Sequence, residues 1–352
     1  MEEIKAISEG KIIAKRWKVI EKLGEGGMGA VFKVRDITRF QTYAAMKVEA
    51  DIDDGGVLKL EAHVLKALAP MDYCARFLDG ASCDKYCFIV MTLLGKDLMA
   101  HKRDANVAKL CDQTTLRLAM ATLFAIKQIH EVGYIHRDIK PGNCVTGMNG
   151  SDTKNVYLID YGMVRMWTAL KEGDGKLTFR RARGGDQLFR GTPRYCSLNV
   201  HHRKEQGRVD DLWSWLYMMI ELHTGLPWRR LTDEKEIMEA KQACSMETLL
   251  KGCPKEFEAI YKYLEKLEFK TRPDYFGLWS ECYHGFKRIR GSFFGRFEWE
   301  LNKGGGDKLF TALSISEKRE PRDYKTSTNI QMAKKIWPYA DSNNFKKKYL
   351  TL

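Results

Sequence analysis

The chain has 352 residues, 44% of them apolar, and a formal net charge of +13, and this length fits one two-lobed domain with extensions. The positive charge favours anionic partners, such as acidic or phosphorylated protein, nucleic acid or an acidic membrane surface. Nine cysteines without paired spacing argue against a secreted, disulfide-linked fold and indicate a reducing compartment, the cytoplasm, the nucleus or both. Neither a signal peptide nor a transmembrane stretch is recognisable, so we expect no membrane span.

The predicted strands and helices, together with the composition of the tail, divide the chain into three parts. Residues 1–16 are an N-terminal extension, and residues 17–300 are one domain with a small lobe (17–94) and a large lobe (95–300). Residues 301–352 contain three consecutive glycines and carry eleven Lys or Arg against five Asp or Glu. We expect a mobile basic tail there. The alternative is that its aromatic residues dock part of it onto the domain, namely Trp337, Phe345 and Tyr349.

The first motif along the chain has the glycine pattern G-x-G-x-x-G-x-V. Its defining residues are Gly24, Gly26, Gly29 and Val31. Dinucleotide-binding folds use a similar run of glycines, but there the run opens a helix. Here residues 31–34 alternate apolar and polar side chains, which predicts a strand. The pattern is therefore typical of the loop that covers ATP phosphates in protein kinases.

A lysine and a glutamate follow the glycine motif. Lys47 ends an Ala-Ala-Met-Lys segment, the position of the kinase lysine that contacts the α- and β-phosphates. Glu61 lies within residues 57–68, which have a helical stripe of leucines and stop before Pro70. The spacing of 14 residues favours a pair between Lys47 and Glu61. The alternative is that both are solvated surface charges, as most Lys and Glu residues are.

The most informative stretch is residues 136–143, His-Arg-Asp-Ile-Lys-Pro-Gly-Asn, which follows a predicted helix that stops at Gly133. Phosphoryl transfer needs a carboxylate to orient the attacking hydroxyl, and a further carboxylate with an amide to hold magnesium. Asp138 fits the first role, and Asn143 fits the amide. Lys140 lies where its ammonium can neutralise charge on the transferred phosphoryl group. The whole run is typical of the catalytic loop of protein kinases.

Further along, a short apolar strand is predicted over residues 156–159, directly before Asp160. Asp160 opens an Asp-Tyr-Gly segment and fits the second magnesium-holding carboxylate. Thr192 can bridge Asp138 and Lys140 through its hydroxyl. A lysine two residues after the catalytic aspartate is the serine/threonine kinase arrangement, so we expect transfer to serine or threonine. Beyond this region, helices are predicted to dominate to about residue 300.

From about residue 16 to residue 299 the chain resembles the casein kinase I superfamily of serine/threonine kinases. Where most kinases have Ala-Pro-Glu after the activation segment, residues 197–199 are Ser-Leu-Asn, which is similar to the casein kinase I pattern. Within the superfamily the chain resembles the tau-tubulin kinase branch most closely. The segments that carry this finer resemblance are residues 16–19, 47–49, 210–214, 226–229 and 297–299.

The resemblance implies an α+β, two-lobed kinase fold that binds ATP and Mg²⁺ between a β-rich small lobe and a helical large lobe. It implies an ATP site formed by Leu23, Gly24, Gly26, Gly29, Val31, Ala45, Lys47, Glu61, Met91, Thr92 and Leu94. Met91 would be the gatekeeper, and residues 92–94 the hinge. Asp211 would hold the backbone of the catalytic loop. Tyr161 replaces the usual Phe of Asp-Phe-Gly, and its hydroxyl needs a partner if it is buried.

The basic residues cluster on the predicted substrate side. Residues 171–208 carry ten Lys or Arg against four Asp or Glu, a net +6, so we expect protein substrates with acidic or phosphorylated segments. By the resemblance, Arg194 matches a position that helps to bind a phosphate upstream of the target residue. A guanidinium suits this task, because its planar fork can hold two phosphate oxygens. For Arg180–Arg183, a solvated basic loop is the alternative.

Two other classes of protein compete with an active kinase. A pseudokinase scaffold would bind protein partners without transferring phosphate, but such proteins usually lose residues of the Lys47, Asp138 or Asp160 type. A nucleic-acid-binding protein would explain the charge, yet aromatic residues between the basic runs are sparse. We therefore expect a monomeric kinase that acts on proteins, and we do not expect nucleic acid as a partner.

Overall fold

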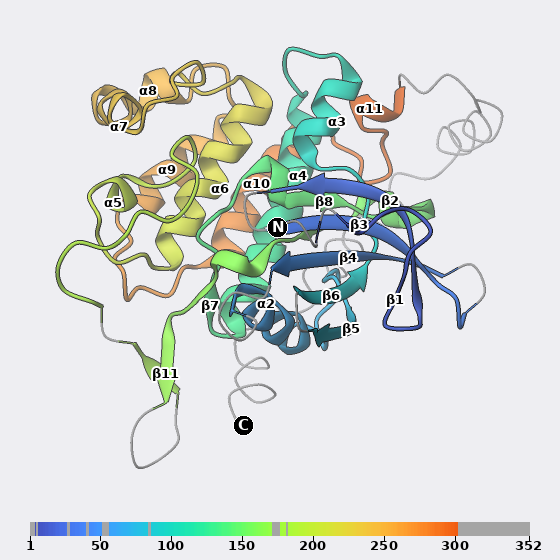
Figure 1. Cartoon of the computed structure of the whole chain (residues 1–352). Helices are drawn as coiled ribbons and strands as arrows, with labels where there is room; N and C mark the ends of the chain where they lie inside the picture. Colours follow the sequence, from blue (N-terminus) through green and yellow to red (C-terminus); the bar gives the residue numbers. More distant parts are fainter. Residues whose placement is uncertain are drawn as a thin grey trace.

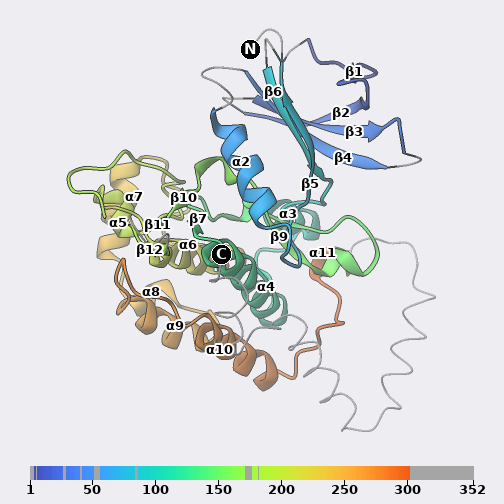
Figure 2. The same ribbon diagram turned by 90° about the horizontal axis from the view of Figure 1, so that it is seen from below.

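The chain is described by a computed structural model. It covers residue 4 and residues 6–26, 29–39, 42–50, 56–83, 86–170, 177–180 and 182–301. The chain forms a small lobe, which consists of a sheet and one helix, and a larger helical lobe (Figure 2). This is the two-lobed α+β arrangement that the resemblance implies. The predicted basic tail lies outside the described residues, apart from Leu301.

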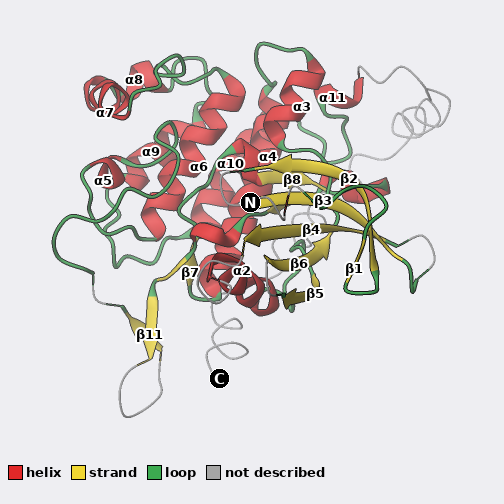
Figure 3. Cartoon of the chain, in the orientation of Figure 1, coloured by secondary structure: helices red, strands yellow, loops and turns green. Residues whose placement is uncertain are grey.

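The small lobe is built on an antiparallel sheet with the strand order β1-β2-β3-β4-β6-β5 (Figures 1 and 3). Its strands are β1 (Ile12–Ile13), β2 (Trp17–Glu25), β3 (Gly29–Asp36), β4 (Tyr43–Ala50), β5 (Phe77–Ser82) and β6 (Tyr86–Thr92). Helix α2 (Gly56–Ala67) lies beside the sheet and next to the larger lobe (Figure 2). It corresponds to the helix predicted over residues 57–68.

Alternation along β4 separates the two faces of the sheet. Ala44, Met46 and Val48 are fully buried in the core of the small lobe. Ala45 and Lys47 point to the opposite face, because successive side chains of a strand alternate. One face of β4 therefore packs in the core of the small lobe, and the other face is available to bind a ligand.

The register of the strands gathers predicted ATP-site residues on that second face. Val31 pairs with Lys47, and Ala45 pairs with Met91. Directly paired residues of antiparallel strands point to the same side of the sheet. Met91 also joins the buried cluster that continues through α2 into the larger lobe, and Ala45 packs against that cluster. The face that carries these four residues is therefore turned toward the junction of the lobes.

Residues ahead of Trp17 belong to the small lobe where the structure describes them. Strand β1 pairs with the start of β2, with Ile13 opposite Trp17. Ile4, Ile7 and Ile13 are buried in the core of the small lobe. Residues 1–16, which the sequence led us to treat as an extension, therefore contribute a strand and apolar packing. Burial of their isoleucines in the core of the small lobe stabilises this arrangement.

The larger lobe is mainly helical, as predicted (Figure 3). Its helices are α3 (Leu98–Ala105), α4 (Asp112–Glu131), α5 (Leu198–His201), α6 (Arg208–His223), α7 (Glu234–Ala243), α8 (Met246–Leu249), α9 (Glu256–Leu264), α10 (Tyr275–Arg288) and α11 (Glu298–Leu301). Helices α4 and α6 form its centre, and nearly every side chain of both is buried. Among the described helices, none is both long enough and apolar enough to cross a membrane.

Three pairs of short antiparallel strands belong to the larger lobe. The pairs are β7 (Tyr134–Ile135) with β10 (Arg165–Met166), β8 (Cys144–Thr146) with β9 (Val156–Leu158), and β11 (Thr168–Leu170) with β12 (Leu177–Phe179). The β11–β12 pair projects from the body of the lobe (Figure 1). The β8–β9 pair brings the catalytic loop and the Asp-Tyr-Gly segment side by side.

Helix α4 ends just before the predicted glycine stop. Gly133 has φ +93°, in the left-handed region that favours glycine. A Cβ atom at this position would lie 2.8 Å from the Oγ1 of Thr168. The glycine therefore lets the chain turn directly from the helix into β7 and the catalytic loop.

The last described residues return to the helical lobe. The ring of Trp299 stacks on His101 of α3 with centroids 4.6 Å apart. The guanidinium of Arg117 lies 4.0 Å from the ring centroid of the buried Phe297. Glu298 accepts a hydrogen bond of 2.6 Å from the Thr114 hydroxyl. Side chains of α11 and of the residue before it thus tie this end of the chain to α3 and α4.

Candidate active site

The sheet, α2 and the Asp-Tyr-Gly segment together hold Lys47 between two carboxylates. Its Nζ lies 2.7 Å from Oε2 of Glu61 and 3.0 Å from Oδ1 of Asp160. Burial lowers the pKa of Lys47, but Glu61 and Asp160 outweigh it and raise the pKa above its ordinary value. Lys47 is therefore a cation at neutral pH. The solvated alternative for the Lys47–Glu61 pair does not hold, because Glu61 is only 1% exposed.

Asp160 projects into the space between the lobes from a strained backbone position. It has φ +66° two residues after the end of β9, a conformation that is uncommon for residues other than glycine. Burial raises the pKa of Asp160, but Lys47 outweighs this and lowers it, so the carboxylate is ionised. The N–H of the next residue, Tyr161, donates to Oε1 of Glu61 at 3.3 Å. Glu61 thus links α2 to both the lysine and the Asp-Tyr-Gly segment.

The buried Tyr161 finds the partner that its hydroxyl needs. The hydroxyl donates to the carbonyl of Leu158 in β9 at 2.7 Å. Its ring meets the ring of His136 edge-on, with centroids 5.7 Å apart. Leu65 of α2 belongs to the same buried cluster. The ring of Tyr161 therefore packs between the lobes, and its extra oxygen stays within a hydrogen bond.

Three donors surround the carboxylate of Asp138. The Lys140 ammonium lies 2.6 Å from Oδ2, and the Thr192 hydroxyl donates to Oδ1 at 2.7 Å. The Asn143 amide donates to the Asp138 carbonyl at 2.9 Å and to Oδ2 at 3.1 Å. Lys140 also donates to the Thr192 hydroxyl at 3.3 Å. The structure thus joins the four predicted catalytic residues into one network, in which the carboxylate has a defined orientation.

A buried aspartate holds the backbone of this loop. Asp211 accepts hydrogen bonds from the N–H groups of His136 and Arg137, at 2.6 and 2.8 Å. The ring of His130 lies 2.9 Å from the same carboxylate and 2.7 Å from the Tyr275 hydroxyl. Burial opposes ionisation of Asp211, but the bond to His130 lowers its pKa. Sequence reasoning missed His130, because a histidine on the buried side of a helix carries no local motif.

The glycines near the β2–β3 turn have different roles. A Cβ atom on Gly29 would lie 2.0 Å from the carbonyl oxygen of Val48, so the strand pairing excludes any side chain there. No heavy atom lies within 4 Å of a Cβ built on Gly24 or Gly26. These two glycines therefore leave open space around the backbone, as a loop over phosphates needs. Leu23, next to them in β2, has 48% of its surface exposed.

The predicted hinge continues from β6. Met91 at the end of the strand is buried, and Leu94 is half-buried. The N–H of Thr92 donates to the carbonyl of Arg76 at 3.0 Å. The N–H of Thr92 is therefore already bonded and is not free to bind a base.

Two arginines of the activation segment are engaged with protein groups. Arg194 donates to the carbonyl of Arg229 at 2.7 Å and lies 3.8 Å from Oε1 of Glu221, with about a third (32%) of its side chain exposed. Arg180 pairs with Glu205 at 2.6 Å. The solvated-loop alternative for Arg180 is therefore wrong, because a glutamate distant in sequence reaches it. The side chain of Arg194 is somewhat more exposed than that of Arg180, which is 21% exposed.

The residues present fit a magnesium ion held together with nucleotide. The amide nitrogen of Asn143 is bonded to Asp138, which leaves its carbonyl oxygen as a ligand. Asp160 adds carboxylate oxygens. Mg²⁺ prefers oxygen ligands and is usually bound by one or two carboxylates plus substrate phosphates. Among the described residues, no cluster of three or more His, Cys, Asp or Glu side chains forms a metal site.

Comparison with known proteins agrees with this geometry. The protein kinase domain model matches residues 17–280. A protein of Caenorhabditis elegans named as a serine/threonine-protein kinase is 38% identical over 300 residues, which cover 84% of each chain. One of Dictyostelium discoideum, named in the same way, is 36% identical over 301 residues, 84% of this chain but 59% of that protein. Casein kinase I homolog 3 of Schizosaccharomyces pombe is 30% identical over 341 residues, 95% of this chain and 76% of the homolog. The chain therefore belongs to the protein kinase family, as a serine/threonine protein kinase with casein kinase I-like relatives.

Proposed function

We propose that this kinase transfers the γ-phosphate of ATP to serine or threonine residues in acidic or already phosphorylated protein segments. The observation that supports this preference most directly is the position of Arg194. It lies two residues after Thr192, whose hydroxyl bonds the Asp138 carboxylate, and its guanidinium is partly exposed. An anionic group beside the target residue would meet a cation close to the reacting hydroxyl.

The hydrogen-bond network around Asp138 supports separate roles for the residues in the cleft. We assign to Asp138 the orientation of the attacking hydroxyl, to Lys140 the neutralisation of charge on the transferred phosphoryl group, and to Thr192 the task of holding the Asp138 carboxylate. Lys47, fixed by Glu61, would bind the α- and β-phosphates of ATP. Asn143 and Asp160 would hold Mg²⁺, which when bound supplies positive charge to the phosphoryl oxygens.

The nucleotide itself would lie against the open face of the sheet. That face carries Val31, Ala45 and Met91 beside Lys47. The flap with Gly24, Gly26 and Gly29 would cover the phosphates. Leu23 is exposed beside it, where it can cover the base. The Thr92 carbonyl and the backbone at Leu94 would meet the base at the hinge.

The experiment compares two peptides that differ only in one residue before the target serine, phosphoserine in one and alanine in the other. We expect the wild type to prefer the primed peptide, and Arg194→Ala to reduce that preference about ten- to a hundredfold, since a hydrogen bond to a charged group contributes about 1.5–3 kcal/mol. Arg103→Ala, on the exposed side of α3, is the matched control.

A second substitution should act in the opposite direction. The Glu221 carboxylate lies near Arg194 and also accepts the N–H of Leu226 at 2.7 Å. Glu221→Gln keeps an acceptor and removes the competing charge, so it should raise the preference for the primed peptide. Equal rates on both peptides in the wild type at low salt would refute the proposed preference. Lack of any transfer from ATP would instead favour a scaffold that binds partners.

We also propose that the chain belongs to the tau-tubulin branch. The support is the finer resemblance of residues 16–19, 47–49, 210–214, 226–229 and 297–299. Asp210 of one of these segments accepts from the Ser197 hydroxyl at 2.5 Å, so it contacts the Ser-Leu-Asn sequence that carries the wider casein kinase I resemblance. We further propose that the protein is a monomer and that it is located in the cytoplasm, the nucleus or both. Light scattering of the purified protein and imaging of the tagged chain would test those two points.

A further inference from the structure

A buried lysine of α7 lies beneath the substrate side of the activation segment. Lys241 is 5% exposed, and its Nζ donates to the carbonyl of Pro193 at 2.7 Å and to that of Cys196 at 2.5 Å. Ile237 and Lys241, one helical turn apart, are the buried residues of α7. The ammonium thus occupies a position where the helical stripe calls for an apolar side chain.

The third N–H of the Lys241 ammonium donates to the ring of His201. Nε2 of His201 in α5 lies 3.2 Å from Nζ. Burial lowers the pKa of His201 to about 4, so the ring is neutral and Nε2 accepts. An ammonium has three donors and no acceptor, so two carbonyls and this ring satisfy it completely.

The other charged or titratable groups around this ammonium provide little compensation. The Cys196 sulfur lies 4.0 Å from Nζ, and burial raises the pKa of this thiol to about 12. The ring centroid of Tyr217 in α6 lies 5.1 Å from Nζ, and its phenol stays protonated because burial raises its pKa. Glu234 of α7 lies 3.7 Å from Nδ1 of His201. Among the described residues, no carboxylate forms an ion pair with Lys241, although buried lysines usually have one.

The segment that Lys241 holds carries groups of the proposed substrate site. Pro193 follows Thr192, which bonds Asp138, and Arg194 lies between the two carbonyls that Lys241 binds. The indole N–H of Trp228 donates to the Arg194 carbonyl at 2.9 Å. Three carbonyls of this short segment therefore receive donors from the side of the helical lobe.

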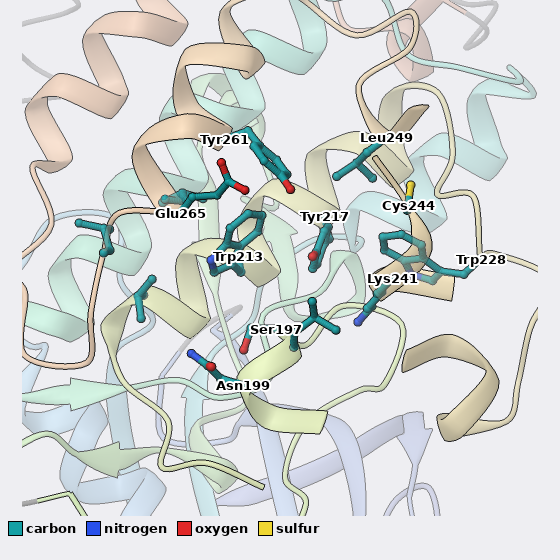
Figure 4. Close-up of a pocket in the computed structure, with 14 residues that line it drawn as sticks. Ser197, Asn199, Trp213, Tyr217, Trp228, Lys241, Cys244, Leu249, Tyr261 and Glu265 are labelled. Atoms are coloured by element: carbon teal, nitrogen blue, oxygen red, sulfur yellow. The ribbon is translucent and has the colours of Figure 1, made fainter. Parts of the chain in front are cut away.

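A cavity lies beside Lys241 and the residues that directly follow the segment. It has a volume of about 330 Å³ and is lined by Lys241, Ser197, Tyr217 and Trp228, among others. Figure 4 shows Lys241 at its wall, close to Ser197 and Trp228. Lys241 thus contacts both this cavity and the carbonyls of Pro193 and Cys196.

We propose that Lys241 is a positioning residue for protein substrate: its ammonium fastens residues 193–196 so that Thr192 and Arg194 face the target segment. The proposal rests on the protein kinase activity and extends it to a residue outside the cleft. Burial lowers the pKa of Lys241 to about 8. The ammonium has hydrogen-bond acceptors but, among the described residues, no ion pair, and groups with perturbed pKa values of this kind cluster at functional sites.

The test is Lys241→Met, which keeps the length of the apolar stem and removes the donors. Both the primed and the neutral peptide are used, because Lys241 acts through the backbone and not through the phosphate. We expect kcat/KM for both peptides to fall about ten- to a hundredfold, mainly through KM, while KM for ATP stays within about twofold. Lys235→Met is the matched control, since Lys235 lies on the exposed side of the same helix.

The wild type offers a second measurement that needs no substitution. The ammonium is present below pH 8 and lost above it, and the neutral amine keeps only two, weaker donors. KM for the neutral peptide should therefore rise between pH 7 and pH 9 in the wild type and in Lys235→Met, and stay high and flat in Lys241→Met.

Two outcomes overturn the proposal. The first is an unchanged KM for both peptides in Lys241→Met with no difference in the pH profile. The second is a parallel loss of ATP binding and thermal stability, which would make Lys241 a general packing residue. Failure of the proposed substrate preference looks different, since the wild type would then treat both peptides alike while Lys241→Met still raised KM for each.

Discussion

Replacement of Thr192 by valine tests the network around the catalytic carboxylate. Valine keeps the branched shape and removes only the hydroxyl, so Asp138 loses the 2.7 Å bond and Lys140 loses its 3.3 Å acceptor. A hydrogen bond to a charged group contributes about 1.5–3 kcal/mol, and full loss of it in the transition state would lower kcat about 10- to 150-fold. Because Lys140 and Asn143 keep their bonds to Asp138, we expect the lower part of this range, about ten- to thirtyfold.

The assay is steady-state phosphorylation of one peptide at saturating ATP, together with measurement of nucleotide affinity. Nucleotide affinity should not change, because Thr192 makes no contact with Lys47 or Glu61 among the described hydrogen bonds. Thr192→Ser keeps the hydroxyl and is the control, which should retain kcat within about threefold. A Thr192→Val enzyme that works as fast as the wild type, or a Thr192→Ser enzyme that fails equally, would refute the assigned role.

Three further predictions concern the cleft and its regulation. Lys47→Met and Asp160→Asn should each abolish transfer without unfolding the protein, and the double variant should be no worse than either, because these groups act as a unit; peptide phosphorylation with circular dichroism as the fold control checks this. Tyr161→Phe should lower the free energy of unfolding by about 1–2 kcal/mol and leave kcat within about twofold, since only the bond to Leu158 is lost. Urea denaturation and steady-state kinetics measure both quantities, and an unchanged stability or a large loss of kcat would contradict this prediction. Phosphatase treatment should leave activity intact, because the pair of Lys47 with Glu61 is formed without a phosphate; a loss that autophosphorylation restores would contradict this.

The parts of the site that lie close together in sequence were predictable. Asp138, Lys140 and Asn143 lie within one eight-residue run, so their order alone indicated their chemistry. The helix with Glu61 followed from the periodicity of its leucines, and its observed bounds are Gly56–Ala67. In each case a local pattern determines a local structure, and the fold then brings it to the cleft.

The contacts that were not predictable join residues far apart in the chain. Lys241 reaches a carbonyl 45 residues away at Cys196, and a lysine in a helix gives no sign of being buried. Arg180 pairs with Glu205 across 25 residues, although a run of positive charge indicates a solvated loop. Such contacts depend on how helices pack, and tertiary packing overrides local preference.

The packing at the two ends of the described chain determines where the boundaries of an independently folding kinase domain lie. Residues 17–280 match the kinase domain model, yet a protein cut to those limits would lack β1, α11 and the second half of α10, including the buried Cys282 and Phe286. It would bare the edge of β2 and the apolar surface that Ile13 covers, and an open strand edge invites pairing with another chain. At the other end it would lose the stacking of Trp299 on His101. A truncated kinase of that kind would aggregate for reasons unrelated to its catalytic residues.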